Sequence, residues 1–411
     1  MNILYLSSSC SEEKFHRLQQ AGITQSVPQA QKYHALLRDG IEANLPGSTR
    51  AISLIATNSN WTKQFRFPQE KEVSGGIPYT YAGFLNRPFL RQWSAYRNVK
   101  RAIKEAVRGK ENIIIICDVL NVTLAKASRK MGKKYGFPVV GIVTDVPGIR
   151  SEEHRKQRKT YSFFRRVMVD TAEKQTKKAM EAYDGYLFLT QAMNDVVNRK
   201  GKPYLVMEGH ADIRMKNKTS SLKDKTEPKV LLYAGGIHRE YGIRILTEAF
   251  LKGRFSGWQF HIYGDGNYRE ELTRIARENE RVRYFGLLPN EEIVEAQLKA
   301  SLLVNPRPTD EEFVKYSFPS KTLECMASGT PFLTTRLPGM PEEYKSHVYF
   351  FDEESVEGFR RTLQEVLALS AEELYNTGED ARNFVLEEKN NRKQAEKLVK
   401  FLKENYENSG N

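Results

Sequence analysis

The sequence predicts an α/β fold with two domains, each built on a parallel β-sheet with helices on both faces. Apolar, strand-like runs alternate with amphipathic helical patterns along most of the 411 residues, which is typical of parallel sheets. The length also exceeds what a single hydrophobic core usually supports. A polar stretch at residues 216–228 interrupts the alternation, and we interpret it as the linker between the two domains.

The first predicted domain spans residues 1–215. Its short apolar runs are predicted strands: Asn2–Leu6, Arg50–Ile55, Asn112–Cys117, Pro138–Val143, Gly185–Leu189 and Pro203–Met207. Amphipathic patterns between several of them predict helices: Ala30–Leu37, Arg97–Lys110, Leu124–Tyr135 and Ala172–Tyr183. A second alternating set forms the domain 229–388. The last predicted helices are Glu372–Glu388 and Arg392–Tyr406.

Cysteine usage and the first residues indicate a cytoplasmic protein. The chain has three cysteines, Cys10, Cys117 and Cys325, which lie far apart and show no metal-ligand spacing. The segment Met1–Ser9 is a predicted core strand and not a signal peptide, because it is short and no basic residues precede it. The longest apolar run is far too short to span a membrane.

Positive charge is concentrated in the first half of the chain. Residues 1–210 carry 34 Lys and Arg against 18 Asp and Glu, whereas the remainder carries 30 against 33. The excess gathers in Arg97–Lys110 and in Arg155–Lys178, where Phe163 and Phe164 accompany it. Such a surface fits peripheral docking on the anionic inner face of a cell membrane. A solvated basic face is the alternative, and nucleic acid is not an expected partner because no binding module accompanies the charge.

The residues Phe318–Pro331, FPSKTLECMASGTP, predict a loop that leads into a helix with an anion site at its start. Ser320 is the expected N-cap, Lys321 adds a positive charge, and Gly329 ends the helix. Glu324 lies about 5 Å further along the helix axis. This step suits a ligand with a diphosphate at one end and a ribose at the other. An ordinary capped helix with a surface Lys–Glu pair is the alternative.

Four further segments of the second domain are strands that end in glycine- or proline-rich turns: Val230–Gly236, Phe260–Gly266, Arg283–Ile293 and Ser301–Pro308. With Phe318–Pro331, these motifs resemble, in order and spacing, the family 4 glycosyltransferases. The resemblance extends from Val230 to Tyr344.

The resemblance implies the GT-B fold, in which two Rossmann-like domains face each other across a cleft. Residues 229–388 are then the donor-binding domain, 1–215 the acceptor-binding domain, and 389–411 a terminal helix that crosses back to the first domain. The implied activity is transfer of a hexose-type sugar, with retention, from a UDP- or GDP-linked donor. The implied acceptor is a lipid-linked or growing cell-surface glycan, as in polysaccharide biosynthesis. No cofactor is expected beyond the donor substrate.

The chain departs from the family pattern at three places. The usual motif has two glutamates eight residues apart, and Tyr316 stands where the first is expected. Gly236 and Tyr241 stand where many relatives carry Arg and Lys. The chain therefore resembles the subgroup that supplies phosphate charge from Lys321, together with Arg307.

The expected reaction releases a nucleoside diphosphate, so charge on the leaving phosphate must be neutralised. The chain has no Asp-X-Asp metal motif, which leaves fixed cations and backbone donors for this task. The candidates are Lys321, Arg307, Ser320 at the helix start, and the turn of Gly235 and Gly236. A structural salt bridge is the alternative role for Arg307. The backbone of Phe285–Leu288, Leu288 included, is expected to contact the nucleobase.

The acceptor side offers one catalytic candidate, Asp145, at the end of the strand Val139–Val143. Many family members have a histidine in this region. Asp145 is expected to orient the acceptor hydroxyl or the donor sugar, or to assist deprotonation; the alternative is a cap for the turn before Pro147. The loop Ser7–Gln31, with Gly22, Gln25 and Gln29, is expected to shape the acceptor pocket.

Two other functions remain open from the sequence. A GT-B sugar-nucleotide epimerase would use the same donor site without an acceptor. A catalytically inactive GT-B protein would act as a scaffold for partners, and the missing first glutamate and missing histidine keep this alternative open.

Overall fold

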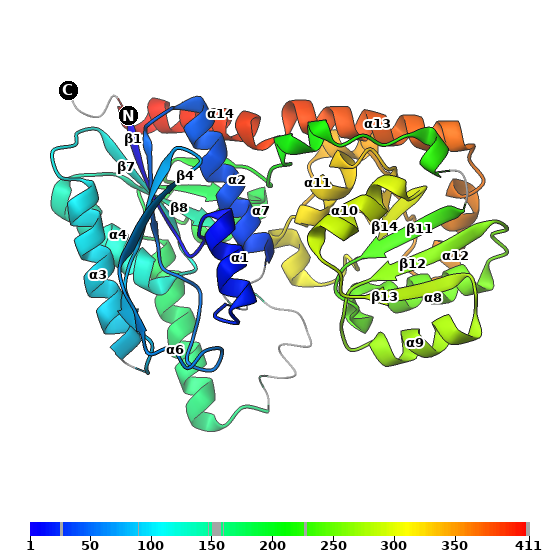
Figure 1. The fold of residues 1–411 in the computed structure, drawn as a ribbon, viewed down its shortest axis with the longest axis horizontal. Helices are drawn as coiled ribbons and strands as arrows, with labels where there is room; N and C mark the ends of the chain where they lie inside the picture. Colours follow the sequence, from blue (N-terminus) through cyan, green and yellow to red (C-terminus); the bar gives the residue numbers. More distant parts are fainter. Residues whose placement is uncertain are drawn as a thin grey trace. The chain divides into compact units, whose positions relative to one another are not determined.

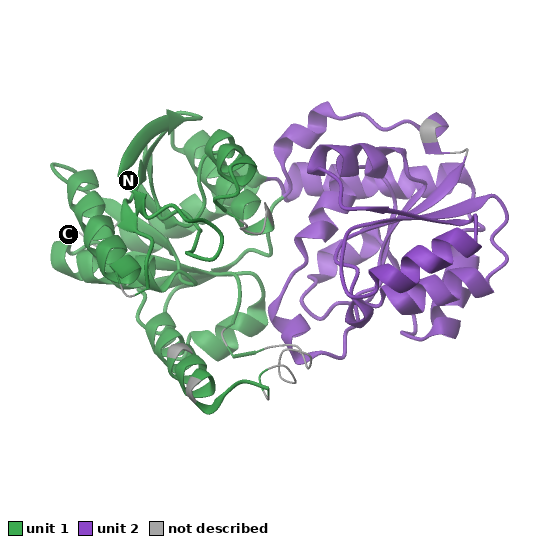
Figure 2. Cartoon of the chain, turned by 60° about the horizontal axis from the view of Figure 1, so that its bottom comes forward, with its two compact units in different colours: residues 1–210, 391–411 green, residues 211–390 purple. Residues whose placement is uncertain are grey.

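The computed structural model describes residues 1–24, 28–88, 90–146, 148–149, 158, 160–225 and 228–407. It divides into two compact units (Figure 2): unit 1 is Met1–His210 with Asn391–Asn411, and unit 2 is Ala211–Asn390. Each unit is a predominantly parallel sheet with helices on both faces, so the predicted fold class is confirmed.

The sheet of unit 1 has eight strands in the order β10-β9-β8-β7-β1-β2-β5-β4. All neighbours are parallel except β4 and β5, which are antiparallel. The strands are β1 Asn2–Ser7, β2 Thr49–Ser53, β4 Glu70–Ser74, β5 Ile77–Tyr81, β7 Ile113–Asp118, β8 Val139–Val143, β9 Gly185–Phe188 and β10 Tyr204–Val206. The short strands β3 Arg66–Phe67 and β6 Phe84–Leu85 pair separately.

The helices of unit 1 cover both faces of this sheet (Figure 1). They are α1 Glu12–Gln20, α2 Pro28–Asn44, α3 Leu90–Ala106, α4 Val122–Tyr135, α6 Phe163–Met180, α7 Gln191–Val197 and α14 Asn391–Leu402, followed by the π-helical turn Lys403–Glu407. Alternate strand residues point to opposite faces. Ile3 and Tyr5 therefore pack with α2 and α14, while α3 and α4 pack together against the other face.

Unit 2 has a six-stranded, fully parallel sheet in the order β13-β12-β11-β14-β15-β16. The strands are β11 Lys229–Ala234, β12 Trp258–Tyr263, β13 Val282–Gly286, β14 Leu302–Asn305, β15 Phe332–Thr334 and β16 Tyr349–Phe350. One face packs on α8 Ile243–Lys252, α9 Arg269–Glu278 and α12 Val356–Val366. The other packs on α10 Asn290–Lys299, α11 Ser320–Ala327 and α13 Ala371–Glu388.

The chain passes between the units at His210–Ala211 and again at Asn390–Asn391. The stretch 216–228 lies within unit 2, where it contributes the short 3₁₀ helices Ile213–Asn217 and Leu222–Lys225. The Lys225 ammonium is buried and donates hydrogen bonds to the backbone oxygens of Leu298 and Ala300, both at 3.0 Å. Lys225 of this polar stretch is therefore packed into unit 2.

Candidate functional site

The functional site of unit 2 is built on the turns that follow its central strands. Ligands of open parallel sheets bind at the carboxyl ends of the strands. At this edge, three backbone hydrogen bonds of 2.8–2.9 Å connect neighbouring turns. The Gly235 amide donates to Tyr263 O and the Ile237 amide donates to Asp265 O. The Gly264 amide donates to Gly286 O. These hydrogen bonds join the turns after β11, β12 and β13 into one rigid edge.

Gly264 allows two of these turns to approach each other closely. Its φ is +133°, a conformation that other residues rarely adopt, and a Cβ at this position would lie 1.7 Å from Gly235 O. Any side chain here would push the β11 and β12 turns apart. The predicted strand–glycine turns thus belong to one backbone surface.

Helix α11 follows this edge and begins at Ser320. The prediction that Ser320 is the N-cap is wrong by one residue. Pro319 is the N-cap, because its extended ψ of 115° turns the chain into the helix and its carbonyl accepts from the Thr322 amide at 2.9 Å. The predicted C-terminal end is confirmed: Gly329, with φ of +72°, follows the C-cap Ser328.

Lys321 points from the first turn of α11 to the glycine turn after β11. A Cβ on Gly235 would lie 2.0 Å from the Lys321 Nζ atom, and Nζ also lies 5.5 Å from the centre of the Tyr233 ring. Burial lowers the pKa of Lys321; Cys325 and Glu324 oppose this shift, and the positive charge of Arg307 adds to it. The structure therefore brings together three of the predicted donor-site residues: Lys321, Arg307 and Gly235.

Arg307 follows β14 and is half-buried. Its guanidinium lies 5.1 Å from the centre of the Phe313 ring, and burial lowers its pKa. Among the described residues, its buried Nε has no hydrogen-bond partner, and neither Arg307 nor Lys321 forms a salt bridge with a carboxylate. The structural salt bridge considered as an alternative role for Arg307 is thus not found in the described part of the chain. Two largely desolvated cations share the carboxyl edge.

The remaining predicted residues lie in different surroundings. Glu324 is half-buried, one turn after Lys321 on α11, and Ser320 is exposed at the helix start. Gly236 follows Gly235, and its carbonyl accepts from the Tyr233 hydroxyl at 2.8 Å. The Leu288 side chain is half-buried and packs against the core of unit 2.

In unit 1, Asp145 is exposed two residues past the end of β8. Pro147, which belongs to the alternative turn-capping role, and Gln25 of the predicted acceptor loop lie outside the described residues.

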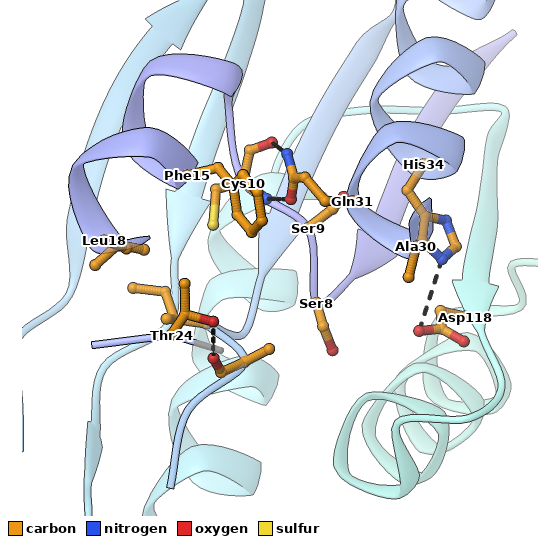
Figure 3. Close-up of a pocket in the computed structure, with 12 residues that line it drawn as sticks. Ser8, Ser9, Cys10, Phe15, Leu18, Thr24, Ala30, Gln31, His34 and Asp118 are labelled. Carbon is orange, nitrogen blue, oxygen red and sulfur yellow. Dashed lines mark hydrogen bonds and ion pairs between the residues drawn. The ribbon is translucent and has the colours of Figure 1, made fainter. Parts of the chain in front are cut away.

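A small cavity of about 40 Å³ lies at the carboxyl edge of unit 1 (Figure 3). It is lined by residues of the loop after β1, of α1 and α2 and the segment between them, of the loop after β2, and of the end of β7. Its polar side chains include Ser8, Gln31, His34 and Asp118. The cavity has room for a few water molecules, which marks this edge as partly hydrated.

His34 and Asp118 form a buried polar pair at this cavity. His34 Nε2 lies 3.7 Å from Asp118 Oδ2, and His34 Nδ1 lies 2.7 Å from the Tyr5 hydroxyl. Burial raises the pKa of Tyr5 and lowers that of His34 to about 3, so a neutral imidazole accepts from the Tyr5 hydroxyl and directs Nε2–H to Asp118. Burial raises the pKa of Asp118 to about 6.

The fully buried Arg38 holds the adjoining loop. It donates to the Ser7 hydroxyl at 3.2 Å, to the Ser9 hydroxyl and to Cys10 O at 3.0 Å. The Gln31 side chain makes two hydrogen bonds with the backbone of Cys10: its amide oxygen accepts from the Cys10 amide, and its amide nitrogen donates to Cys10 O. The segment Ser7–Gln31 was predicted as a loop, which is wrong for much of its length, because Glu12–Gln20 form helix α1 and Gln31 lies on α2. The part directly after β1 borders the cavity, and Gln31 and Arg38 of α2 hold it in place.

Two features of the sequence could have pointed to this pair. Asp118 directly ends the apolar run Ile113–Cys117, where a carboxyl-edge residue is expected. Gln31, His34 and Arg38 stand at helical spacing on one buried face of α2. Buried polar side chains at such spacing require partners and therefore indicate a network.

Among the described residues, no group of three or more His, Cys, Asp or Glu side chains could hold a metal ion. Within the same part of the chain, no helix is long and apolar enough to cross a membrane.

Residues 228–369 match the family model described as glycosyl transferases group 1, which covers most of unit 2. A search of the curated proteins finds no match.

Solved structures of similar fold include sucrose-phosphate synthase from Thermosynechococcus elongatus, with a TM-score of 0.67, 14% identity and 100% of both chains covered. Another is HepE from Anabaena in complex with UDP-glucose, with a TM-score of 0.62, 14% identity, and 98% and 100% of the two chains covered. A third is the UDP-forming α,α-trehalose-phosphate synthase from Burkholderia xenovorans, with a TM-score of 0.64, 11% identity, and 98% and 100% covered. At these identities the likeness shows the fold, which is GT-B as predicted.

Proposed function

We propose that the protein is a retaining glycosyltransferase of family 4, in the subgroup with an FPSK-type donor helix. It moves a hexose-type sugar from a nucleoside-diphosphate sugar to a lipid-linked or growing cell-surface glycan. The group 1 glycosyltransferase match over residues 228–369 and the GT-B fold support the reaction class. The structure of HepE was solved with UDP-glucose, which makes a UDP-linked sugar the first donor to test.

The pair of Lys321 and Arg307 is the observation that carries this proposal. Both cations are largely desolvated at the carboxyl edge of unit 2, and no carboxylate of the described residues neutralises them through a salt bridge. Burying charge without a partner costs free energy. A bound diphosphate would offset this cost by supplying two or more negative charges beside the Gly235 turn.

In the proposed mechanism, Lys321 and Arg307 stabilise the charge that grows on the leaving β-phosphate. The turn of Gly235 and Gly236 brings the backbone close to the phosphates without an intervening side chain. Glu324, one turn further along α11, accepts hydrogen bonds from the ribose hydroxyls. Ser320 donates from the start of the helix, and the backbone at Leu288 contacts the base.

The proposed acceptor site lies at the carboxyl edge of unit 1, around Asp145 and the His34–Asp118 pair. Asp145 and Asp118 follow the neighbouring strands β8 and β7, so both carboxylates belong to one edge. Carboxylates are suited to orient sugar hydroxyls and to assist removal of the acceptor proton. Both ring nitrogens of the neutral His34 already face Tyr5 and Asp118, so in this proposal His34 positions the Asp118 carboxyl group.

We further propose that unit 1 docks on an anionic membrane surface from the cytoplasm. On α3, Arg97, Arg101 and Lys104 are exposed, and the nearby Trp93 side chain is 60% exposed. The Phe163 side chain at the start of α6 is 74% exposed. Basic side chains combined with exposed aromatic ones are typical of interfacial docking. The predicted basic residues Arg155, Lys156 and Lys159 lie outside the described residues.

A nucleotide screen tests the donor site directly. Thermal shifts are measured with UDP, GDP, ADP and CMP for wild-type protein, for K321A and for the matched control K299A, which removes an exposed lysine of α10. A ligand that binds only folded protein raises the melting temperature. We expect one nucleoside diphosphate to stabilise wild type and K299A more than K321A. No shift with any nucleotide would contradict the proposal and favour a scaffold.

Product analysis then separates the remaining alternative. With the sugar nucleotide of the stabilising base, a glycosyltransferase releases the nucleoside diphosphate in proportion to added acceptor. An epimerase converts the sugar nucleotide without an acceptor. Conversion of the donor sugar in the absence of any acceptor, with no net transfer, would overturn the proposed reaction.

A further inference from the structure

Unit 1 contains a second polar groove, at the edge of its sheet opposite the carboxyl ends. It has a volume of about 1150 Å³, and the starts of β7 and β8, helix α4 and residues 405–407 contribute to its walls. This volume is large enough for a ligand of drug size or more. Because it is lined by the amino ends of the strands, the groove is separate from the cavity at His34 and Asp118.

Five basic side chains line this groove: Lys126, Arg129, Lys130, Lys133 and Lys202. Within the described part of the chain, none of them forms a salt bridge. The two carboxylates of the groove have other partners. Asp184 accepts from the Val139 amide at 2.9 Å, and Glu407 pairs with the amino terminus at 3.3 Å. The groove therefore has an excess of positive charge that the protein itself does not neutralise.

The spacing of three of these lysines follows one stripe of helix α4. Lys126, Lys130 and Lys133 are exposed, and they are separated by about 6 Å and about 4.5 Å along the helix axis. Like charges four residues apart on a helix repel each other, so Lys126 and Lys130 repel in the absence of an anionic ligand. Lysine ammonium groups bind phosphate as point charges.

We propose that this groove binds a soluble ligand that carries several phosphate groups. The concave shape favours a soluble ligand over a lipid surface. Arg129 and Lys202 are half-buried within the groove, where a flat bilayer surface does not reach. A chain of phosphates can lie along the lysine stripe and contact these two recessed cations as well. The inference is independent of the proposed glycosyltransferase activity.

Isothermal titration calorimetry of the full-length protein with sodium tripolyphosphate tests this site. The groove variant is K126Q/K130Q/K133Q, and the matched control is R101Q/K104Q/R108Q, which removes three positive charges from exposed side chains outside the groove. We expect binding by wild type, roughly tenfold weaker binding by the groove variant, and binding within about twofold of wild type by the control. Thermal melts establish that both variants remain folded.

Tripolyphosphate also resembles the diphosphate of a nucleotide, so its binding at the donor site around Lys321 must be distinguished from its binding in the groove. A binding event at the donor site disappears in K321A and persists in the groove variant, whereas the groove event shows the reverse. Lack of any event that the groove variant weakens would overturn the proposal, and so would equal weakening in both triple variants. Loss of tripolyphosphate binding on addition of phosphatidylglycerol vesicles would instead assign the groove to a lipid surface.

Discussion

The ammonium group of Lys321 rests against the backbone of Gly235, in the space that a Cβ at this glycine would occupy. A Cβ there would lie 2.0 Å from Nζ and 2.8 Å from the Tyr233 hydroxyl. The two residues come from different segments: Gly235 from the turn after β11 and Lys321 from the first turn of α11. The position of the lysine charge therefore depends on the absence of a side chain in the glycine turn.

The first prediction follows from this contact. G235A should displace the lysine, because its ammonium group is the flexible partner, and turnover should fall about as far as in K321A. The fold should persist, since Gly235 does not adopt a positive φ. Melting temperature and turnover with the donor found by nucleotide screening are the measurements. Unchanged turnover in a folded G235A protein would contradict the role of this contact.

The second prediction concerns Lys321 itself. If its charge stabilises the leaving phosphate, K321A should lower kcat by roughly 10²–10³-fold, the usual cost of removing one transition-state donor. KM for the donor should change much less, because the interaction strengthens towards the transition state. Steady-state kinetics check this, with K299A as the control lysine in unit 2. A rise in KM at constant kcat would mean that Lys321 binds the ground state and the transition state equally well.

The third prediction tests Glu324 against the ribose. Wild-type protein should bind the ribonucleoside diphosphate more tightly than its 2′-deoxy form, by roughly tenfold, because a hydrogen bond to a carboxylate is lost. E324Q should bind the ribo form more weakly and discriminate less between the two forms. Titration calorimetry of both proteins with both ligands gives the coupling between carboxylate and hydroxyl. Equal discrimination by wild type and E324Q would place the ribose elsewhere.

Much of unit 2 could be predicted from its sequence because the signals are local. Short apolar runs end in glycine turns at Gly235, Gly264 and Gly286, and each run is a parallel strand. The end of α11 at Gly329 was also visible, since glycine readily adopts the left-handed conformation. Its start was misassigned by one residue because Pro319 and Ser320 both suit a helix start, and only the backbone angles distinguish them.

The site of unit 1 was harder to predict, because the residues that form its polar contacts are far apart in the sequence. His34 and Asp118 lie 84 residues apart, and neither stands in a motif. The antiparallel hairpin of β4 and β5 was not predicted, although Gly75 and Gly76, both with positive φ, form its turn. Three of the five residues of β4 are exposed, so the strand has no apolar run that the sequence could reveal. Helix α2 is also longer than predicted, because small and polar residues extend it to Asn44.

The fourth prediction concerns pH and Asp118. Burial raises its pKa from 3.8 to about 6, so the folded state binds a proton more tightly than the unfolded state does. Ionisation of Asp118 therefore destabilises the fold, and this contribution grows as the pH rises through 6. Relative to wild type, D118N should gain on the order of 1 kcal/mol of unfolding free energy between about pH 5 and about pH 8.

Denaturant unfolding at several pH values measures this difference. D195N, which removes an exposed carboxylate on α7, serves as the control and should follow the pH dependence of wild type. In wild type, His34 has the opposite effect on the pH dependence of stability. Its pKa is lowered to about 3, so its contribution to stability is lost as the pH falls below 6.5. The double variant H34Q/D118N should therefore lack both effects. A constant difference between D118N and wild type would contradict the buried ionisation.

The fifth prediction separates membrane docking from the phosphate groove. Wild-type protein should sediment with anionic vesicles at low salt and be released at high salt, where the screening length falls to about 3 Å. Each basic residue near an anionic surface contributes about 1 kcal/mol. R101Q/K104Q/R108Q should then bind roughly 100-fold more weakly, while K126Q/K130Q/K133Q should bind as wild type does.

W93A should weaken vesicle binding at every salt concentration, because the exposed Trp93 contributes apolar contact and no charge. Equal binding to neutral and anionic vesicles would contradict electrostatic docking, and loss of binding only in the α4 variant would move the membrane contact to the groove.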